Sequence, residues 1–236
     1  MIAIISTVNS MVLFPSALTS VLVLLEVGVL VTEFLMLRAH LLRSQVRLYM
    51  VQSLLVALLA LVMGVHFDSD GLYVVSAMAV VVKVILVPML IIRLLRTNQG
   101  DLSQSAVMKL PSMLYIALIA SALGFFMAGP LSGAGVLGKG SMISRHAIPI
   151  ELAVVFMAFV LIGFRRDVIS QIVGFFSLEN GITLISMSIA ANMPFIVEVA
   201  TFFDLLVAAV AFGLLMRLHH MKAGTLSTHT LERLKG

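Results

Sequence analysis

The sequence contains no cysteine and no tryptophan, and only 11% of its 236 residues are charged. The absence of cysteine excludes disulfide bonds, thiolate metal sites and cysteine-held iron–sulfur clusters. Without tryptophan, an aromatic belt at the membrane interfaces must come from Tyr49, Tyr73, Tyr115 and the phenylalanines. Ordinary soluble domains carry about 25% charged residues. The small charged fraction therefore excludes a soluble enzyme, a disordered chain, a coiled coil and a nucleic-acid-binding protein.

Hydrophobic residues make up 61% of the chain, and the mean hydropathy is +1.16. They occur in long continuous runs, whereas the strands of a membrane barrel would show alternating polarity. A spanning helix needs about 20 mainly apolar residues, so the sequence predicts an all-α polytopic membrane helix bundle of about seven transmembrane helices. The predicted spans are residues 14–37, 47–67, 71–95, 112–129, 148–164, 170–191 and 194–216.

These spans divide the chain into four regions. A four-helix membrane region covers 1–129, a three-helix region covers 148–216, and a polar tail covers 217–236. Between the two membrane regions, residues 130–147 form a predicted Gly-rich external loop. This loop follows no strand and lacks the G-x-x-x-x-G-K-[ST] pattern, so we interpret it as a connector and not as a phosphate-binding loop.

The basic residues predict the orientation of the chain, because cytoplasmic loops are enriched in lysine and arginine. Only Lys139 and Arg145 fall on one side of the predicted spans, and the first loop on that side carries Asp68 and Asp70. We therefore expect the N-terminus outside, the C-terminus in the cytoplasm, and an odd number of spans. The basic residues on the other side are Arg38, Arg43, Arg47, Arg93, Arg96, Lys109, Arg165, Arg166, Arg217, Lys222, Arg233 and Lys235.

Seven ionisable residues fall inside the predicted spans, where each charged group costs about 2.5–3.5 kcal/mol at the bilayer centre on insertion scales. Residues of this kind usually face a bundle interior or a water-filled path. For two of them we expect a structural role. Glu33 is near the cytoplasmic end of its span and can snorkel, and Glu151 is near a helix start, where a carboxylate favours the helix dipole. The other five are Glu26, Lys83, Glu179, Glu198 and Asp204.

Four of these five lie at similar depth, about 12 or 13 residues from the outer face. At 1.5 Å per residue this depth is near the membrane midplane; Glu198 lies nearer the outer face. Burial favours the uncharged forms of acids and of lysine, so these groups can gain and lose protons. We interpret them as a proton relay; buried ion pairs that hold helices together are the alternative.

Three neighbouring residues support the relay interpretation. Asn180 and Gly181 follow Glu179 directly: an amide can orient a carboxylate or a water, and glycine admits close helix packing or a local break. Pro88 lies five residues after Lys83, where it should kink the helix and free a carbonyl.

No catalytic constellation is present in the sequence. The six histidines lie in loops, at span edges or in the tail, without partners at metal-ligand spacing. We therefore expect no catalytic residue, no metal and no cofactor, and no direct small-molecule substrate or nucleic-acid partner.

The stretch QIVGFFSLENGITLISMSIAANMPFIVEVATFFDLLVAAVAFGLLMRL, residues 171–218, resembles the C-terminal part of the hydrogenase-4 component E family. The shared features are Glu-Asn-Gly at 179–181, Pro-x-x-x-Glu at 194–198, and Asp204. Further resemblance lies in YMVQSLL at 49–55, VKVILVPML at 82–90 and GTLSTHTLERLKG at 224–236. Members of that family are membrane subunits of complex I-like, group 4 [NiFe] hydrogenases. The last three predicted helices also look like the small three-helix subunit of complex I.

This resemblance implies a non-catalytic subunit of the bacterial inner membrane, packed against antiporter-like and other membrane-arm subunits and lipid, with redox centres in its partners. It assigns Glu179 and Asp204 to the two proton-transfer positions of the complex I subunit, with aspartate in place of glutamate at the second. The implied function is part of a buried proton or Na⁺ path. A stand-alone secondary transporter and a purely structural membrane-arm subunit remain as alternatives.

Overall fold

A computed structural model describes residues 16–97, 110–133, 147–189 and 213 of the chain. The elements within these ranges are all helices, which confirms the predicted all-α class over this part of the chain. They are α2 (Ser16–Arg38), α3 (Leu42–Phe67), α4 (Asp70–Met78), the π-helix η1 (Ala79–Leu86), α5 (Val87–Thr97), α6 (Leu110–Gly133), α7 (Ala147–Phe164) and α8 (Val168–Ile189).

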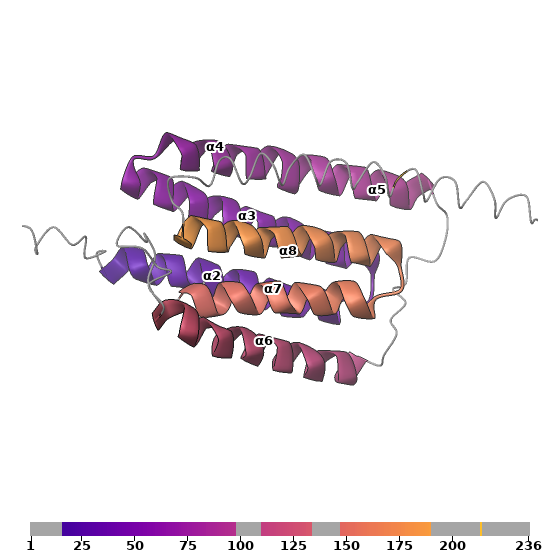
Figure 1. Ribbon diagram of the computed structural model, residues 1–236. Coiled ribbons are helices and arrows are strands. Elements are labelled where there is room, and N and C mark those ends of the chain that lie inside the picture. The colour runs from indigo at the N-terminus through magenta and orange to yellow at the C-terminus, as the bar shows by residue number, and fades with distance from the viewer. Residues whose placement is uncertain (1–15, 98–109, 134–146, 190–212, 214–236) are drawn as a thin grey trace, which may run out of the picture.

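The helices lie side by side with roughly parallel axes (Figure 1). Helix α7 packs against α2, α6 and α8, and α3 packs against α2, α4, η1 and α8. The outer positions in Figure 1 are taken by α6 on one side and by α4, η1 and α5 on the other. The bundle interior is therefore formed mainly by α2, α3, α7 and α8.

Among the described residues, five helical segments are long and apolar enough to cross a membrane, and they match the first five predicted spans. Helix α8 covers the sixth predicted span but is not among these five segments. The seventh predicted span, 194–216, lies outside the described residues. The five candidate spans are Leu18–Arg38, Leu42–Phe67, Asp70–Arg93, Leu110–Pro130 and Ala147–Phe164.

Some helix ends lie beyond the predicted spans. Helix α3 begins at Leu42, five residues before the predicted start, because its first turn is polar and an apolar run marks only the lipid-facing length. Helix α6 includes Pro130 and ends at Gly133, so the first residues of the predicted Gly-rich loop are helical. Proline removes only one backbone hydrogen bond, and this loss falls in the last turns of α6.

The third predicted span contains a π-helix where we expected a proline kink. In η1 the chain follows the wider π geometry, and the backbone N–H of Val87 bonds to the carbonyl of Val82, five residues earlier. Pro88 comes directly after this bond, at the start of α5, and its ring replaces the next N–H. π-helical turns are rare and are frequently found at functional sites. Here the π-helix contains Lys83.

Buried apolar side chains form two separate clusters along the bundle axis. One cluster includes Met36, Val46 and Phe176, near the ends of the helices that are joined by residues 39–41 and 165–167. The second includes Leu22 and Met63, toward the opposite end. On α2, α3 and α8, polar residues lie between the residues of the two clusters. The polar interior is thus near the middle of the bundle, where a membrane-spanning protein would place it at the midplane.

Candidate proton-transfer site

Eight buried polar residues form what we call the central polar layer, between the two apolar clusters. Each is at most 4% exposed. Helix α8 contributes four of them, and the others come from α2, α3 and η1. They are Glu33, Gln52, Ser53, Lys83, Ser177, Glu179, Asn180 and Thr183.

An ion pair joins η1 to α8 within this layer. The Nζ atom of Lys83 lies 2.6 Å from Oε1 of Glu179. The same Nζ donates a hydrogen bond of 3.3 Å to Oγ1 of Thr183, whose hydroxyl donates in turn to the backbone carbonyl of Glu179 at 2.9 Å. Both charged side chains are almost fully buried, at 0% and 2% exposure. The structure therefore brings together two of the residues that the sequence singles out, from helices 96 positions apart.

Asn180 continues the polar contacts from this pair toward α3 and α2. Its Nδ2 donates to Oε1 of Gln52 and to Oγ of Ser53, each at 3.1 Å. Gln52 Nε2 then donates to Oε2 of Glu33 at 2.7 Å, and the hydroxyl of Ser177 donates to the same oxygen. Adjacent residues of α8 thus contact η1 and α3. The ion pair and the hydrogen bonds that reach α2 are two groups of polar side chains, which the backbone of Glu179 and Asn180 joins.

Gly181 allows α8 to approach α7 closely. A Cβ atom there would lie 2.8 Å from Cγ2 of Val155 and 3.3 Å from the backbone nitrogen of the same residue. Real Cβ atoms do not approach to 2.8 Å, so a larger residue at 181 would push the two helices apart.

Two sequence-based expectations are wrong. Glu33 does not snorkel toward the interface: it is fully buried and hydrogen-bonded in the central polar layer, because α3 and α8 cover this part of α2. Tyr49 does not belong to a lipid-facing aromatic belt. It is fully buried against Phe176, with ring centroids 5.6 Å apart, and within electrostatic range of Glu179.

No sequence pattern points to Gln52, Ser53, Ser177 and Thr183. A signal existed for Glu33, because it follows Glu26 by seven residues and so shares its helix face. Single amides and hydroxyls inside apolar runs give no comparable signal, since serine and threonine are common in membrane helices.

A second polar cluster, the acid pair, consists of Glu26 on α2 and Glu151 on α7. Both side chains are fully buried, and their carboxylates are close enough to interact electrostatically. The hydroxyl of Ser188 on α8 donates to Oε1 of Glu151. Glu26 was predicted to belong with Lys83, but its described neighbour is Glu151. The other two predicted relay residues, Glu198 and Asp204, lie outside the described residues.

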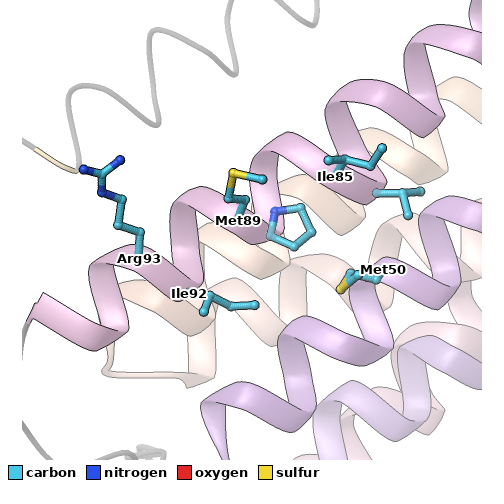
Figure 2. Close-up of a pocket in the computed structure, with 7 residues that line it drawn as sticks. Met50, Ile85, Met89, Ile92 and Arg93 are labelled. Atoms are coloured by element: carbon cyan, nitrogen blue, oxygen red, sulfur yellow. The ribbon is translucent and has the colours of Figure 1, made fainter.

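An open apolar groove with a volume of about 650 Å³ lies between α3 and the η1–α5 segment. Figure 2 shows Met50 on one side and Arg93 at one end, with the Arg93 side chain directed away from Met50. No residue of the central polar layer lines this groove, so the ion pair does not open into it. Its lining residues are Met50, Val84, Ile85, Pro88, Met89, Ile92 and Arg93.

Two bacterial proteins are similar to this chain over most of their length. Hydrogenase-4 component E of Escherichia coli (strain K12) is 26% identical over 188 residues, which are 80% of this chain and 85% of that protein. An uncharacterized protein of Mycobacterium tuberculosis (strain ATCC 25618 / H37Rv) is 26% identical over 189 residues, which are 80% of this chain and 84% of that protein. No family model and no solved structure matches the chain.

These similarities confirm the resemblance to hydrogenase-4 component E that the sequence motifs indicate. The five apolar helices found among the described residues agree with the membrane subunit that this resemblance implies. The chain is therefore a multi-pass protein of the inner membrane that is similar to hydrogenase-4 component E.

Proposed function

We propose that this chain is a non-catalytic membrane subunit of a complex I-like [NiFe] hydrogenase or a related respiratory complex, in which it contributes part of a buried proton or Na⁺ path. Redox centres would belong to partner subunits. The single observation on which the proposal rests is the buried Lys83–Glu179 ion pair, beside which Asn180 begins a set of hydrogen bonds that reaches α3 and α2. Intramembrane ionisable residues mark ion pathways by default.

The chemistry of the central polar layer suits proton transfer. A lysine and a glutamate 2.6 Å apart can exchange a proton directly, because either group can be neutral in a buried site. Hydroxyls such as those of Ser53 and Ser177 can accept one proton and release another. The amides of Gln52 and Asn180 hold these groups in place. The direction of the path is lateral, from η1 toward α2.

Residues outside the central polar layer complete the proposed path. Asp204 and Glu198 are assigned to it by the resemblance to hydrogenase-4 component E and the small complex I subunit. Glu26 would extend it along α2, on the same face as Glu33.

The proposed topology has seven spans, with the N-terminus outside and the C-terminus in the cytoplasm. It is supported by Arg165, whose guanidinium Nη2 donates to the carbonyls of Leu37 and Ala39 at 2.6 and 3.2 Å and so joins two basic turns at one end of the bundle. A reporter that is active only in the cytoplasm, fused after Gly236, should be active. A fusion active only in the periplasm would contradict this topology.

Purification of the tagged chain tests its proposed place in a complex. Gentle solubilisation should recover it in stoichiometric amounts with hydrogenase-type membrane subunits and a [NiFe] protein. Recovery of a stable lone protein that catalyses transport would instead support a stand-alone secondary transporter.

A purely structural membrane-arm subunit is the second candidate, because a buried ion pair can also hold helices together. A charge-preserving change separates the two candidates. Lys83→Arg keeps the ion pair but replaces an amine that can lose its proton with a guanidinium that cannot. The relay proposal expects an assembled complex with impaired translocation, whereas the structural role expects both to be normal.

A further inference from the structure

The acid pair differs from the Lys83–Glu179 pair, because its two members have the same sign. Glu26 and Glu151 are each 0% exposed. Both oxygens of Glu26 and Oε2 of Glu151 lack a hydrogen-bond partner among the described residues. The fourth oxygen, Oε1 of Glu151, accepts a hydrogen bond from the hydroxyl of Ser188.

The packing of α2 against α7 places the two acids at the same level of the bundle. Leu22 and Val29 precede and follow Glu26 on one face of α2, and both belong to the same apolar cluster as Ala147 and Val154 of α7. Glu151 lies between these two α7 residues. The carboxylates therefore share one apolar compartment, which agrees with their electrostatic interaction.

Two carboxylates in such a compartment cannot both remain ionised without a compensating cation. Within the described ranges no ion pair involves either acid, since the ion pair of the interior joins Lys83 to Glu179. Nor do the described residues bring together three or more acidic or histidine side chains, as a metal site would need. A proton is the cation that requires the fewest ligands, because one O–H group and one acceptor are enough.

We propose that Glu26 and Glu151 form a proton-binding pair that holds one exchangeable proton in common. Protonation of one carboxyl removes the like-charge repulsion between the two acids. The new O–H group can then donate a hydrogen bond to a carboxylate oxygen of the other acid, which has no donor among the described residues. Ser188 then fixes Glu151 by donating to its other oxygen. The pair is a second proton site in the interior, separate from the lysine–glutamate pair. Only its use in transport rests on the proposed function; the binding of the proton does not.

Infrared spectroscopy of the purified full-length chain in lipid nanodiscs tests this pair, with ¹³C-glutamate to identify the band of protonated glutamate. At neutral pH the wild type should show such a band, and it should shift in D₂O. Glu26→Gln and Glu151→Gln should each remove the same band area, and the double variant should remove no more than either single variant. The reason is that one proton serves both acids, and that the amide introduced by either substitution can donate to the remaining carboxylate.

Asp70→Asn is the matched control, because it removes an exposed carboxylate at the start of α4 and should leave the band unchanged. An additive loss in the double variant would mean two independent protons and would overturn the proposal. So would the absence of any loss, or a band that disappears when Na⁺ replaces K⁺, which would identify a sodium site.

Ser188→Ala is a second test of the acid pair, which does not depend on whether the glutamine variants fold. It preserves both acids but removes the hydroxyl donor, so the carbonyl stretch of the protonated carboxyl should move to higher frequency. An unchanged frequency would contradict the assignment of this proton to the acid pair. None of these measurements involves turnover, so a negative result would leave the Lys83–Glu179 path untouched.

Discussion

The described part of the bundle contains two buried pairs of ionisable side chains, and they differ in how their charge is compensated. Lys83 and Glu179 have opposite charges and lie 2.6 Å apart, so each compensates the other. Glu26 and Glu151 have the same charge, and no ion pair compensates either of them among the described residues. Helix α8 contacts both pairs, through Glu179 itself and through Ser188.

Burial alone therefore does not decide the protonation state of a membrane carboxyl. An ion pair can remain charged in the interior when its geometry is good and its remaining atoms are hydrogen-bonded. A pair of acids needs a proton instead. A proton path that uses both kinds of site would have one place where the proton can be exchanged with an amine and one where it is held between carboxyls.

Removal of the lysine should have the largest effect. Lys83→Met leaves Glu179 as an uncompensated buried charge, which should lower the free energy of unfolding by about 3–5 kcal/mol. Replacing both members, as in Lys83→Met with Glu179→Leu, should restore most of this loss, because apolar pairs of similar volume are often neutral. Denaturation of the purified chain in mixed micelles measures both values. A double variant as unstable as Lys83→Met would show that the lysine contributes through packing and not through its charge.

Gly181→Ala should have an intermediate effect. The added Cβ would lie 2.8 Å from Val155 and would force α7 away from α8 between the two charged pairs. Overpacking of this kind costs about 1–3 kcal/mol. Gly163→Ala is the matched control on α7, because a Cβ there meets nothing within 4 Å, and its unfolding free energy should be unchanged or slightly higher. Equal effects of the two substitutions would refute the close approach at Gly181.

Ser177→Ala should have the smallest effect. It removes one of the two donors to Oε2 of Glu33, and Gln52 keeps the other. Hydrogen bonds between membrane helices contribute about 0.6 kcal/mol on average. Ser186→Ala, whose hydroxyl bonds only to a carbonyl of its own helix, should leave the unfolding free energy unchanged. A loss of several kcal/mol for Ser177→Ala would mean that Glu33 depends on the network far more than its two donors suggest.

Much of the fold follows from the sequence, because the bilayer requires long apolar helices with internally bonded backbones. The five candidate spans match predicted ones for this reason. The same physics identifies Lys83 and Glu179, since charges are too costly in lipid to be accidental. What the sequence cannot supply is the choice of partner. Glu26 and Glu179 have similar predicted depths, and only helix packing decides which of them contacts Lys83.

The burial of Glu33 also depends on tertiary structure. Near the end of an isolated span a glutamate can reach the interface, so its position alone suggests snorkelling. In the bundle, α3 provides Gln52 and α8 provides Ser177 as donors at this depth. The π-helix around Lys83 is likewise not evident from an apolar run that reads as an ordinary helix.

The central claim is that the carboxyl of Glu179 takes part in proton transfer. Glu179→Gln keeps size and hydrogen bonding but cannot titrate, whereas Glu179→Asp shortens the reach and keeps the carboxyl. The direct measurement is proton uptake in membrane vesicles during turnover of the complex, beside assembly on a native gel. We expect Glu179→Gln to assemble and to retain hydrogen chemistry while translocation is impaired, with Asp204→Asn similarly impaired and Glu179→Asp less so. If Glu179→Gln and Asp204→Asn complexes both assembled and pumped at wild-type rates, the two residues would be structural and the account would be wrong.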